Sequence, residues 1–168
     1  MKVNDYYSSV LGLIRLEADE NALTGLWFED DAELSEKSAE DTDLPDNAVI
    51  HETVKWLDIY FSGKEPDFMP KVRPEGSDFR KKIWDLLLEI PYGETVSYKE
   101  IRDRYLKKYG VSRMAAQAVG NAIGHNPVSL IIPCHRVIGS DGSLTGYGGG
   151  LDRKAYLLKL EKGTKTEE

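Results

Sequence analysis

The stretch SYKEIRDRYLKKYGVSRMAAQAVGNAIG, residues 97–124, carries the sequence signals of two helices joined by a short turn. Ser97 and Glu100 form a capping-box pattern, in which a hydroxyl and a carboxylate satisfy the first free backbone N–H groups of a helix. That helix is predicted to end at Gly110, and Ser112 is predicted to cap the helix that follows. Two helices separated by a turn that contains glycine predict a helix-turn-helix.

The second helix, predicted over residues 113–124, has one face with few large side chains. Its apolar side holds Met114, Ala118, Val119, Ala122 and Ile123. Its other side holds Arg113, Gln117, Gly120, Asn121 and Gly124. A face of this kind can approach another surface closely, so it is consistent either with packing against a neighbouring helix or with insertion into a nucleic-acid groove.

The remainder of the chain predicts an α+β protein with two domains. Alternating apolar residues in SVLGLIRLEAD, a polar DEN turn and ALTGLWFED predict a β-hairpin near the N-terminus. An acidic run at 29–46 predicts a loop, and helical spacing predicts helices over 48–63 and 77–90. Pro66, Pro70 and Pro74 mark a linker. The expected organisation is therefore a small hairpin-and-helix domain, 1–72, and a mostly helical domain with the helix-turn-helix, 73–168.

Charge is distributed unevenly between these two regions. Residues 1–70 contain 5 Lys/Arg and 17 Asp/Glu, a net charge of −12. Residues 71–168 contain 17 Lys/Arg and 12 Asp/Glu, a net charge of +5. The basic C-terminal region is consistent with a face that binds a polyanion, although two ordinary solvated surfaces would produce the same numbers.

The protein has one cysteine, Cys134, which lies between Pro133 and His135. A thiolate is a nucleophile, and an imidazole beside it can act as the base that generates it. Neighbouring residues on a strand point to opposite faces, so contact between these two side chains requires a turn or a helical start, which Pro133 favours. Glu161 on the predicted last helix is one candidate to orient the imidazole. A buried, unreactive cysteine remains the alternative.

Several other classes of protein do not fit the sequence. One cysteine with His51, His125 and His135 lacks the paired ligand spacing of a zinc site. The GYGGG segment lacks the lysine and hydroxyl residue of a phosphate-binding Walker A loop. No apolar stretch is long enough to cross a bilayer, and the N-terminus does not resemble a secretory signal. With a free thiol, these features favour a cytoplasmic protein.

The C-terminal segment IPCHRVIGSDGSLTGYGGGLDRKAYLLKLE, preceded by PYGETVSY and AVGNAIGHNP, resembles a known family. It is similar to the active-site region of the O6-alkylguanine-DNA alkyltransferases, also called methylated-DNA–protein-cysteine methyltransferases. The resemblance runs from about Phe79 to Gly163. The N-terminal region is similar only in outline to the smaller, ribonuclease-H-like domain of that family.

The resemblance implies a role in the chemistry for five residues. Cys134 corresponds to the residue that accepts the alkyl group, and His135 to the histidine that takes its proton through a water molecule. Glu161 corresponds to the carboxylate that orients this histidine. Tyr98 corresponds to the proton donor to the leaving guanine, and Asn126 to the residue that ties the helix-turn-helix to the active-site turn.

The resemblance also implies that the second helix enters the minor groove and that a damaged base rotates into a pocket. The residues expected to contact DNA are Arg113, Ala115, Ala116, Gln117, Ala118, Gly120, Asn121 and Arg136. The residues expected to line the base pocket are Pro133, Val137, Tyr147, Gly148 and Gly149. No metal or other cofactor is expected, and the protein is expected to act as a monomer on double-stranded DNA that carries O6-alkylguanine.

Gln117 departs from the family pattern, which has an arginine at this position to fill the space left by the rotated base. Glutamine can hydrogen-bond to the orphaned cytosine but has no charge. We therefore expect base flipping to be retained but weaker, or to be shared with Arg113.

The function implied is repair of DNA by direct, stoichiometric transfer of a methyl or other alkyl group to Cys134. A lesion-binding sensor without transfer is an alternative, but sensors of this kind resemble the family without its acceptor cysteine. A cysteine hydrolase that uses Cys134 and His135 is a third hypothesis, for which the sequence contains no specific signal.

Overall fold

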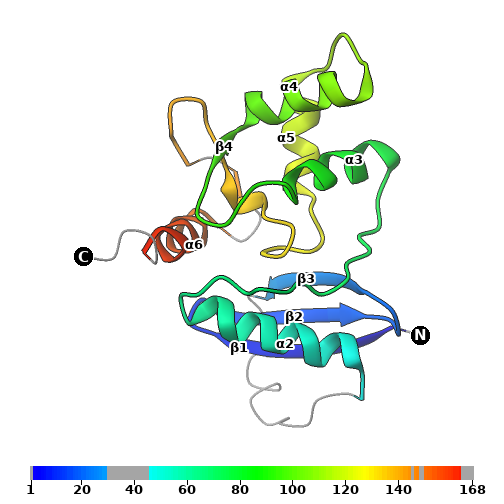
Figure 1. Ribbon diagram of the computed structural model, residues 1–168, viewed down its shortest axis with the longest axis vertical. Helices are drawn as coiled ribbons and strands as arrows, with labels where there is room; N and C mark the ends of the chain where they lie inside the picture. Colours follow the sequence, from blue (N-terminus) through cyan, green and yellow to red (C-terminus); the bar gives the residue numbers. More distant parts are fainter. Residues whose placement is uncertain (1, 30–45, 145, 148–149, 164–168) are drawn as a thin grey trace. The chain divides into compact units, whose positions relative to one another are not determined.

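The computed structural model describes residues 2–29, 46–144, 146–147 and 150–163 (Figure 1). The chain divides into two compact units, Met1–Pro74 and Glu75–Glu168. The predicted acidic loop at 29–46 lies outside the described residues except at its two ends. In the part of the chain that is described, no helix has the length and apolar character to cross a membrane.

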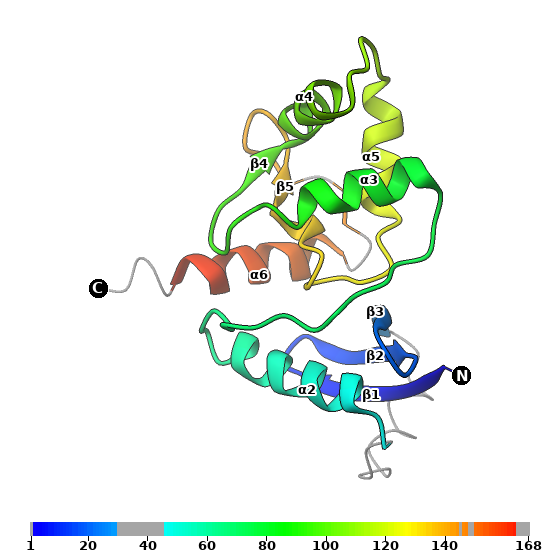
Figure 2. The same ribbon diagram turned by 45° about the vertical axis from the view of Figure 1, so that its right-hand side comes forward.

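The described residues of the N-terminal unit form a three-stranded antiparallel sheet and one helix. Strands β1 (Val3–Ser9), β2 (Gly12–Ala18) and β3 (Leu23–Glu29) lie in the order β1-β2-β3. Helix α2 (Ala48–Phe61) covers one face of the sheet (Figure 2). The predicted hairpin corresponds to β2 and β3. Strand β1 was not predicted, because its sequence VNDYYSS does not alternate between apolar and polar residues.

The C-terminal unit is mostly helical. It contains α3 (Asp78–Leu87), α4 (Tyr98–Tyr109), α5 (Ala116–Gly124) and α6 (Leu151–Gly163). Helices α3, α4 and α5 pack against one another (Figure 1). Trp84 of α3 is buried and its Nε1 donates a hydrogen bond of 2.8 Å to the Ala122 carbonyl of α5. This bond joins the core directly to the second helix of the helix-turn-helix.

The first helix of that motif begins and ends as predicted. The Ser97 hydroxyl accepts a hydrogen bond from the backbone N–H of Glu100, and Gly110 ends α4 in the left-handed conformation. The second helix differs from the prediction, because α5 begins at Ala116 and no side chain caps it. Ser112 lies too early to act as its cap, since the extended residue directly before the helix is Ala115.

A short parallel sheet, which the sequence did not predict, brings the start of α4 to the segment after Cys134. Strand β4 (Val96–Ser97) pairs with β5 (Val137–Ile138), and Ser97 is opposite Ile138. Tyr98 follows β4 directly as the first residue of α4. Two-residue strands have too few residues to show a period of two, so only the folded chain reveals them.

The predicted helix near the C-terminus is present as α6. The helix begins at Leu151, so Asp152 lies inside its first turn. There its negative charge interacts favourably with the N-terminal end of the helix dipole.

Candidate active site

Cys134 lies at the start of a short 3-10 helix, η1 (Cys134–Arg136). Pro133 precedes it with φ −82° and ψ 66°, and the Cys134 N–H donates to the Ile132 carbonyl at 2.8 Å. These torsions and this hydrogen bond are those of an inverse γ-turn. Cys134 therefore lies in a turn and not on a strand, the condition that the sequence set for contact between the side chains of Cys134 and His135.

The turn before Cys134 is strained and is held by Asn126. Leu130 has φ 70°, a conformation that residues with a branched or bulky side chain rarely adopt. Asn126 spans this turn: its Nδ2 donates to the Ile132 carbonyl at 2.8 Å, and its Oδ1 accepts from the Val128 N–H at 2.9 Å. Because Asn126 lies two residues after α5, it links the helix-turn-helix to the turn that carries Cys134.

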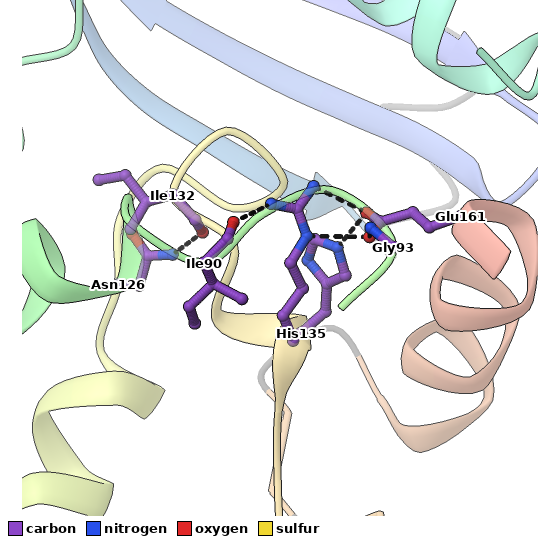
Figure 3. A network of polar contacts seen from close by, with 7 residues as sticks. Ile90, Gly93, Asn126, Ile132, His135 and Glu161 are labelled. Atoms are coloured by element: carbon purple, nitrogen blue, oxygen red, sulfur yellow. Dashed lines mark hydrogen bonds and ion pairs between the residues drawn. The ribbon is translucent and has the colours of Figure 1, made fainter. Parts of the chain in front are cut away.

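Glu161 of α6 joins three other groups in a buried network (Figure 3). Its Oε2 lies 2.7 Å from His135 Nε2, and its Oε1 accepts from Arg136 Nε at 2.9 Å and from the Gly93 N–H at 3.1 Å. Arg136 also donates to the Ile90 carbonyl at 2.7 Å. A carboxylate bound from several sides holds the imidazole in one orientation, which is what a catalytic histidine requires.

This network keeps the carboxylate charged and the imidazole neutral. Burial alone would raise the pKa of Glu161, but its hydrogen bonds and charge interactions with His135 and Arg136 outweigh burial and lower that pKa well below the usual range. Burial lowers the pKa of His135, and the hydrogen bond to Glu161 only partly opposes this effect. At neutral pH His135 is therefore an uncharged base.

The Cys134 side chain is 7% exposed, and its surroundings act on its charge in opposite directions. Burial raises the pKa of the Cys134 thiol, whereas a hydrogen bond from Asn126 and the positive charge of Lys154 lower it. Burial is the larger effect, so the resting residue is a thiol at neutral pH. Reaction as a thiolate then requires a base to remove the proton.

Two tyrosines, Tyr98 and Tyr147, belong to the same part of the C-terminal unit. The Tyr98 hydroxyl donates to the Gly146 carbonyl at 3.3 Å. Burial raises the pKa of Tyr147 well above its usual value, and the charge of Cys134 raises it further. Tyr147 is therefore protonated at neutral pH. The Tyr98 hydroxyl is held in place by its hydrogen bond to the Gly146 carbonyl.

The residues expected to contact DNA lie mostly on one exposed face of α5 and the turn before it. The exposed ones are Arg113, Ala115, Ala116, Gln117 and Asn121, and Ala118 and Gly120 are half-buried. A Cβ atom added at Gly120 would meet no other atom within 4 Å. No packing inside the described chain therefore requires glycine at this position, so the absence of a side chain leaves room for a surface outside it.

Arg136 is a correction to the sequence analysis, which assigned it to DNA contact. Its side chain is buried, and its guanidinium group is bound to Glu161 and to the Ile90 carbonyl. The sequence could not show this, because Glu161 is 25 residues away along the chain. Of the residues expected to line a base pocket, Pro133 and Val137 are buried and Tyr147 is half-buried. Gly148 and Gly149 lie outside the described residues.

Lys154 of α6 is a buried residue that the sequence analysis missed. Its side chain is fully buried, and its Nζ lies 3.5 Å from the Gly146 carbonyl. The sequence contained no signal for this burial, because apolar and polar residues do not lie on separate faces of α6. Within the described residues, no group of three or more histidine, cysteine or acidic side chains is placed to hold a metal ion.

The fold and site together define a helix-turn-helix protein whose single cysteine lies beside a buried histidine–carboxylate–arginine network. Two family models match the chain: the DNA-binding domain of 6-O-methylguanine DNA methyltransferase at residues 78–163, and the ribonuclease-like domain of the same proteins at residues 2–74. The chain belongs to the 6-O-methylguanine DNA methyltransferase family.

Individual relatives are similar over most of their length. The methylated-DNA–protein-cysteine methyltransferase of Methanosarcina barkeri is 46% identical over 158 residues, which cover 94% of this chain and 96% of the relative. The crystal structure of Mycobacterium tuberculosis O6-methylguanine methyltransferase matches with a TM-score of 0.80 and 40% identity, over 100% of this chain and 97% of that one. A structure of the M. tuberculosis protein in complex with DNA matches with a TM-score of 0.79 and 41% identity, over 95% and 92%.

Proposed function

We propose that this protein repairs DNA by transferring the alkyl group of O6-alkylguanine, a methyl group in the simplest case, directly to Cys134. The observation that carries the proposal is the position of Cys134 in a turn next to His135, whose imidazole is held by Glu161 at 2.7 Å. Membership of the family and the relatives named for this activity support it.

The chemistry assigns one task to each group at the site. His135 takes the Cys134 proton, directly or through one water molecule, and Glu161 stabilises the imidazolium that forms. The sulfur then attacks the alkyl carbon in line, a C–S bond forms, and the C–O6 bond breaks with its electron pair leaving on guanine. A proton from Tyr98 neutralises the departing base. The thioether that remains has no route back, so each molecule acts once.

Recognition of the damaged base requires that it leave the stack. The target carbon is inaccessible inside a duplex, and rotating the nucleotide out costs a few kcal/mol. We assign the approach to DNA to the exposed face of α5, where Gly120 leaves room and Gln117 can occupy the space in the stack. Arg113 lines an open groove of about 660 Å³ together with Arg102, which is suitable for phosphate contacts.

The remaining features of the proposal concern organisation and location. We place the DNA-binding, alkyl-acceptor domain at residues 73–168 and a smaller domain with the linker at 1–72. We propose that the protein works as a monomer in the cytoplasm, where reducing conditions keep the Cys134 thiol free.

Intact-mass measurement tests the proposal. After incubation with duplex DNA that carries O6-methylguanine, the protein is expected to gain the mass of one CH2 unit, located at Cys134 by peptide mapping. Cys134→Ser is expected to gain nothing while it still binds the duplex. A protein that binds the lesion but stays unmodified is a sensor, and one that turns over without a permanent adduct is a hydrolase; either result would overturn the proposal.

A further inference from the structure

Arg102 of α4 has a polar atom that the folded chain leaves without a partner. Its Nε is buried, and within the described residues it has no hydrogen-bond partner. When an N–H group of a charged side chain loses its hydrogen bonds to water, the free energy of the folded state rises unless an acceptor replaces them. The position of Arg102 therefore points to an acceptor supplied from outside the chain.

The rest of the Arg102 guanidinium group has one weak ion pair. Its Nη2 lies 4.0 Å from Oδ1 of Asp103, whose side chain is 54% exposed. Asp103 is also shared with Lys99, whose Nζ lies 3.8 Å from its Oδ2. An exposed carboxylate at these distances contributes little to stability and screens a neighbouring charge only in part. Arg102 can therefore bind a second anion.

Arg102 lines an open groove of about 660 Å³ between α4 and the turn that joins α4 to α5 (Figure 2). The described residues that line this groove include two arginines and no acidic residue: Arg102, Leu106, Ser112, Arg113, Met114 and Ala115. Guanidinium groups form paired, charge-assisted hydrogen bonds with phosphate oxygens. The charge of the groove therefore suits a phosphate group.

Ser112 adds a hydroxyl group to the same groove. This hydroxyl does not cap α5, which begins only at Ala116. Serine hydroxyls and arginines are among the groups that contact phosphates in protein–DNA complexes. Ala115, which also lines the groove, directly precedes α5, so the groove adjoins the helix that we place against DNA.

We propose that Arg102 and Arg113 together bind one phosphate group of the DNA backbone in this groove, with the Ser112 hydroxyl as a third donor. The DNA-binding family model at residues 78–163 includes all three residues. The contact positions α5 on the duplex and carries no information about the lesion, because the phosphate is the same at every nucleotide. The inference rests on the proposed function for its partner, duplex DNA.

The test is the salt dependence of binding of the full-length protein to a fluorescent duplex without a lesion, measured by anisotropy. Each phosphate contact that is lost reduces the slope of log K against log salt by about 0.9. Arg102→Met keeps the apolar part of the side chain and removes its charge. We expect its slope to be smaller by about 0.9 and its binding at low salt to be about tenfold weaker. Arg102→Lys, which retains a charge, is expected to keep the wild-type slope.

Arg104→Met is the matched control. Arg104 lies on the same helix, is bound to Glu100, and is not among the residues that line the groove. Its substitution removes the same charge from the same helix, so its slope is expected to match the wild type. Equal reductions of the slope in Arg102→Met and Arg104→Met would show an effect of net charge alone and would overturn the proposal.

Unfolding by urea without DNA separates the phosphate contact from a structural role. Because the folded protein leaves Arg102 Nε without an acceptor, Arg102→Met is expected to keep or raise the urea midpoint. A lower midpoint with a wild-type salt slope would show that Arg102 only supports the fold, and the proposal would be wrong. If Arg102→Met does not fold, Arg102→Gln is measured in its place, with the same expected slope.

Combining Arg102→Met with Arg113→Met tests whether the two arginines bind the same phosphate. Two groups that share one ligand atom group are coupled, so the double variant is expected to lose less affinity than the sum of the two single losses. Additive losses would contradict a shared site.

Failure of this inference is distinct from failure of the proposed function. If Arg102→Met keeps the wild-type slope while the wild-type protein gains a methyl group from lesion-bearing DNA, only the phosphate site is refuted. If the slopes change as expected but the wild-type protein gains no methyl group, only alkyl transfer is refuted.

Discussion

Arg136 and Glu161 form a buried, two-bond ion pair, with Arg136 Nε 2.9 Å from Glu161 Oε1 and Nη2 3.1 Å from Oε2. The pair joins η1 to α6, and the same carboxylate holds His135. Glu161 therefore both balances the buried charge of Arg136 and orients the imidazole of His135.

Glu161→Gln is expected to destabilise the protein and to slow transfer. It leaves the Arg136 charge buried without its counter-ion, which costs about 3–5 kcal/mol when a buried pair loses one partner. Urea denaturation measures the loss, and the rate of methyl transfer to Cys134 measures the effect on His135. Glu89→Gln, in the exposed pair with Lys108 at 3.4 Å, is the matched control and is expected to change stability little. Equal losses for the two variants would contradict the assignment.

The rate of transfer is expected to fall as the solution is acidified. His135 must be neutral to take the Cys134 proton, and its pKa in the folded protein lies below the ordinary value of 6.5. The rate should therefore be level near neutral pH and decrease only when the pH falls below 6.5, towards the lowered pKa.

The free energy of unfolding should also fall as the solution is acidified. Because the folded protein holds His135 neutral, the unfolded chain binds a proton more readily, and stability is lost as the pH falls below 6.5. Glu161 adds to this loss at lower pH. Its pKa in the folded protein lies below the ordinary value of 4.5, so the stability that its charge contributes is lost as the pH falls from 4.5 towards the lowered pKa. Single-turnover rates and urea midpoints between about pH 4 and pH 8 measure both effects. A rate that rises on acidification would contradict the role of His135 as a base.

Gly120→Ala is expected to stabilise the protein and at the same time to weaken its binding to DNA. A Cβ atom at this position meets nothing within 4 Å, so alanine should stabilise α5 by about 0.5–1 kcal/mol through its higher helix propensity. The added methyl group projects where we place the duplex and should weaken binding. Thermal unfolding and a fluorescence-anisotropy titration measure the two effects. Gly163→Ala, at the end of α6 and also without a neighbour within 4 Å, should leave DNA binding unchanged.

Gln117→Arg is expected to increase the rate of repair in duplex DNA. Gln117 is exposed on α5, and arginine would add charge and a larger planar surface to fill the space of the rotated base. In single-stranded DNA that carries the same lesion, where no base pair opens, the substitution should change the rate little. Slower repair of the duplex by the variant would show that glutamine is specifically favoured at this position.

Local sequence signals predicted the elements that form through neighbouring residues. The capping box at Ser97 and the glycine stop at Gly110 fix the ends of α4, because both act on backbone groups within one turn of the helix. The same reasoning failed at Ser112, where the hydroxyl was available but the helix begins only at Ala116. A favourable cap residue does not by itself fix where a helix starts.

The sequence by itself determined that a lone cysteine beside proline and histidine follows a helix-turn-helix, because these patterns depend on residues close together in the chain. Only the tertiary structure decided that Arg136 points inward to Glu161 and that Lys154 is buried with its Nζ near the Gly146 carbonyl. Arg136 and Glu161 are 25 positions apart in the sequence. Their side chains are buried only because the folded chain supplies distant groups that offset the cost of removing them from water.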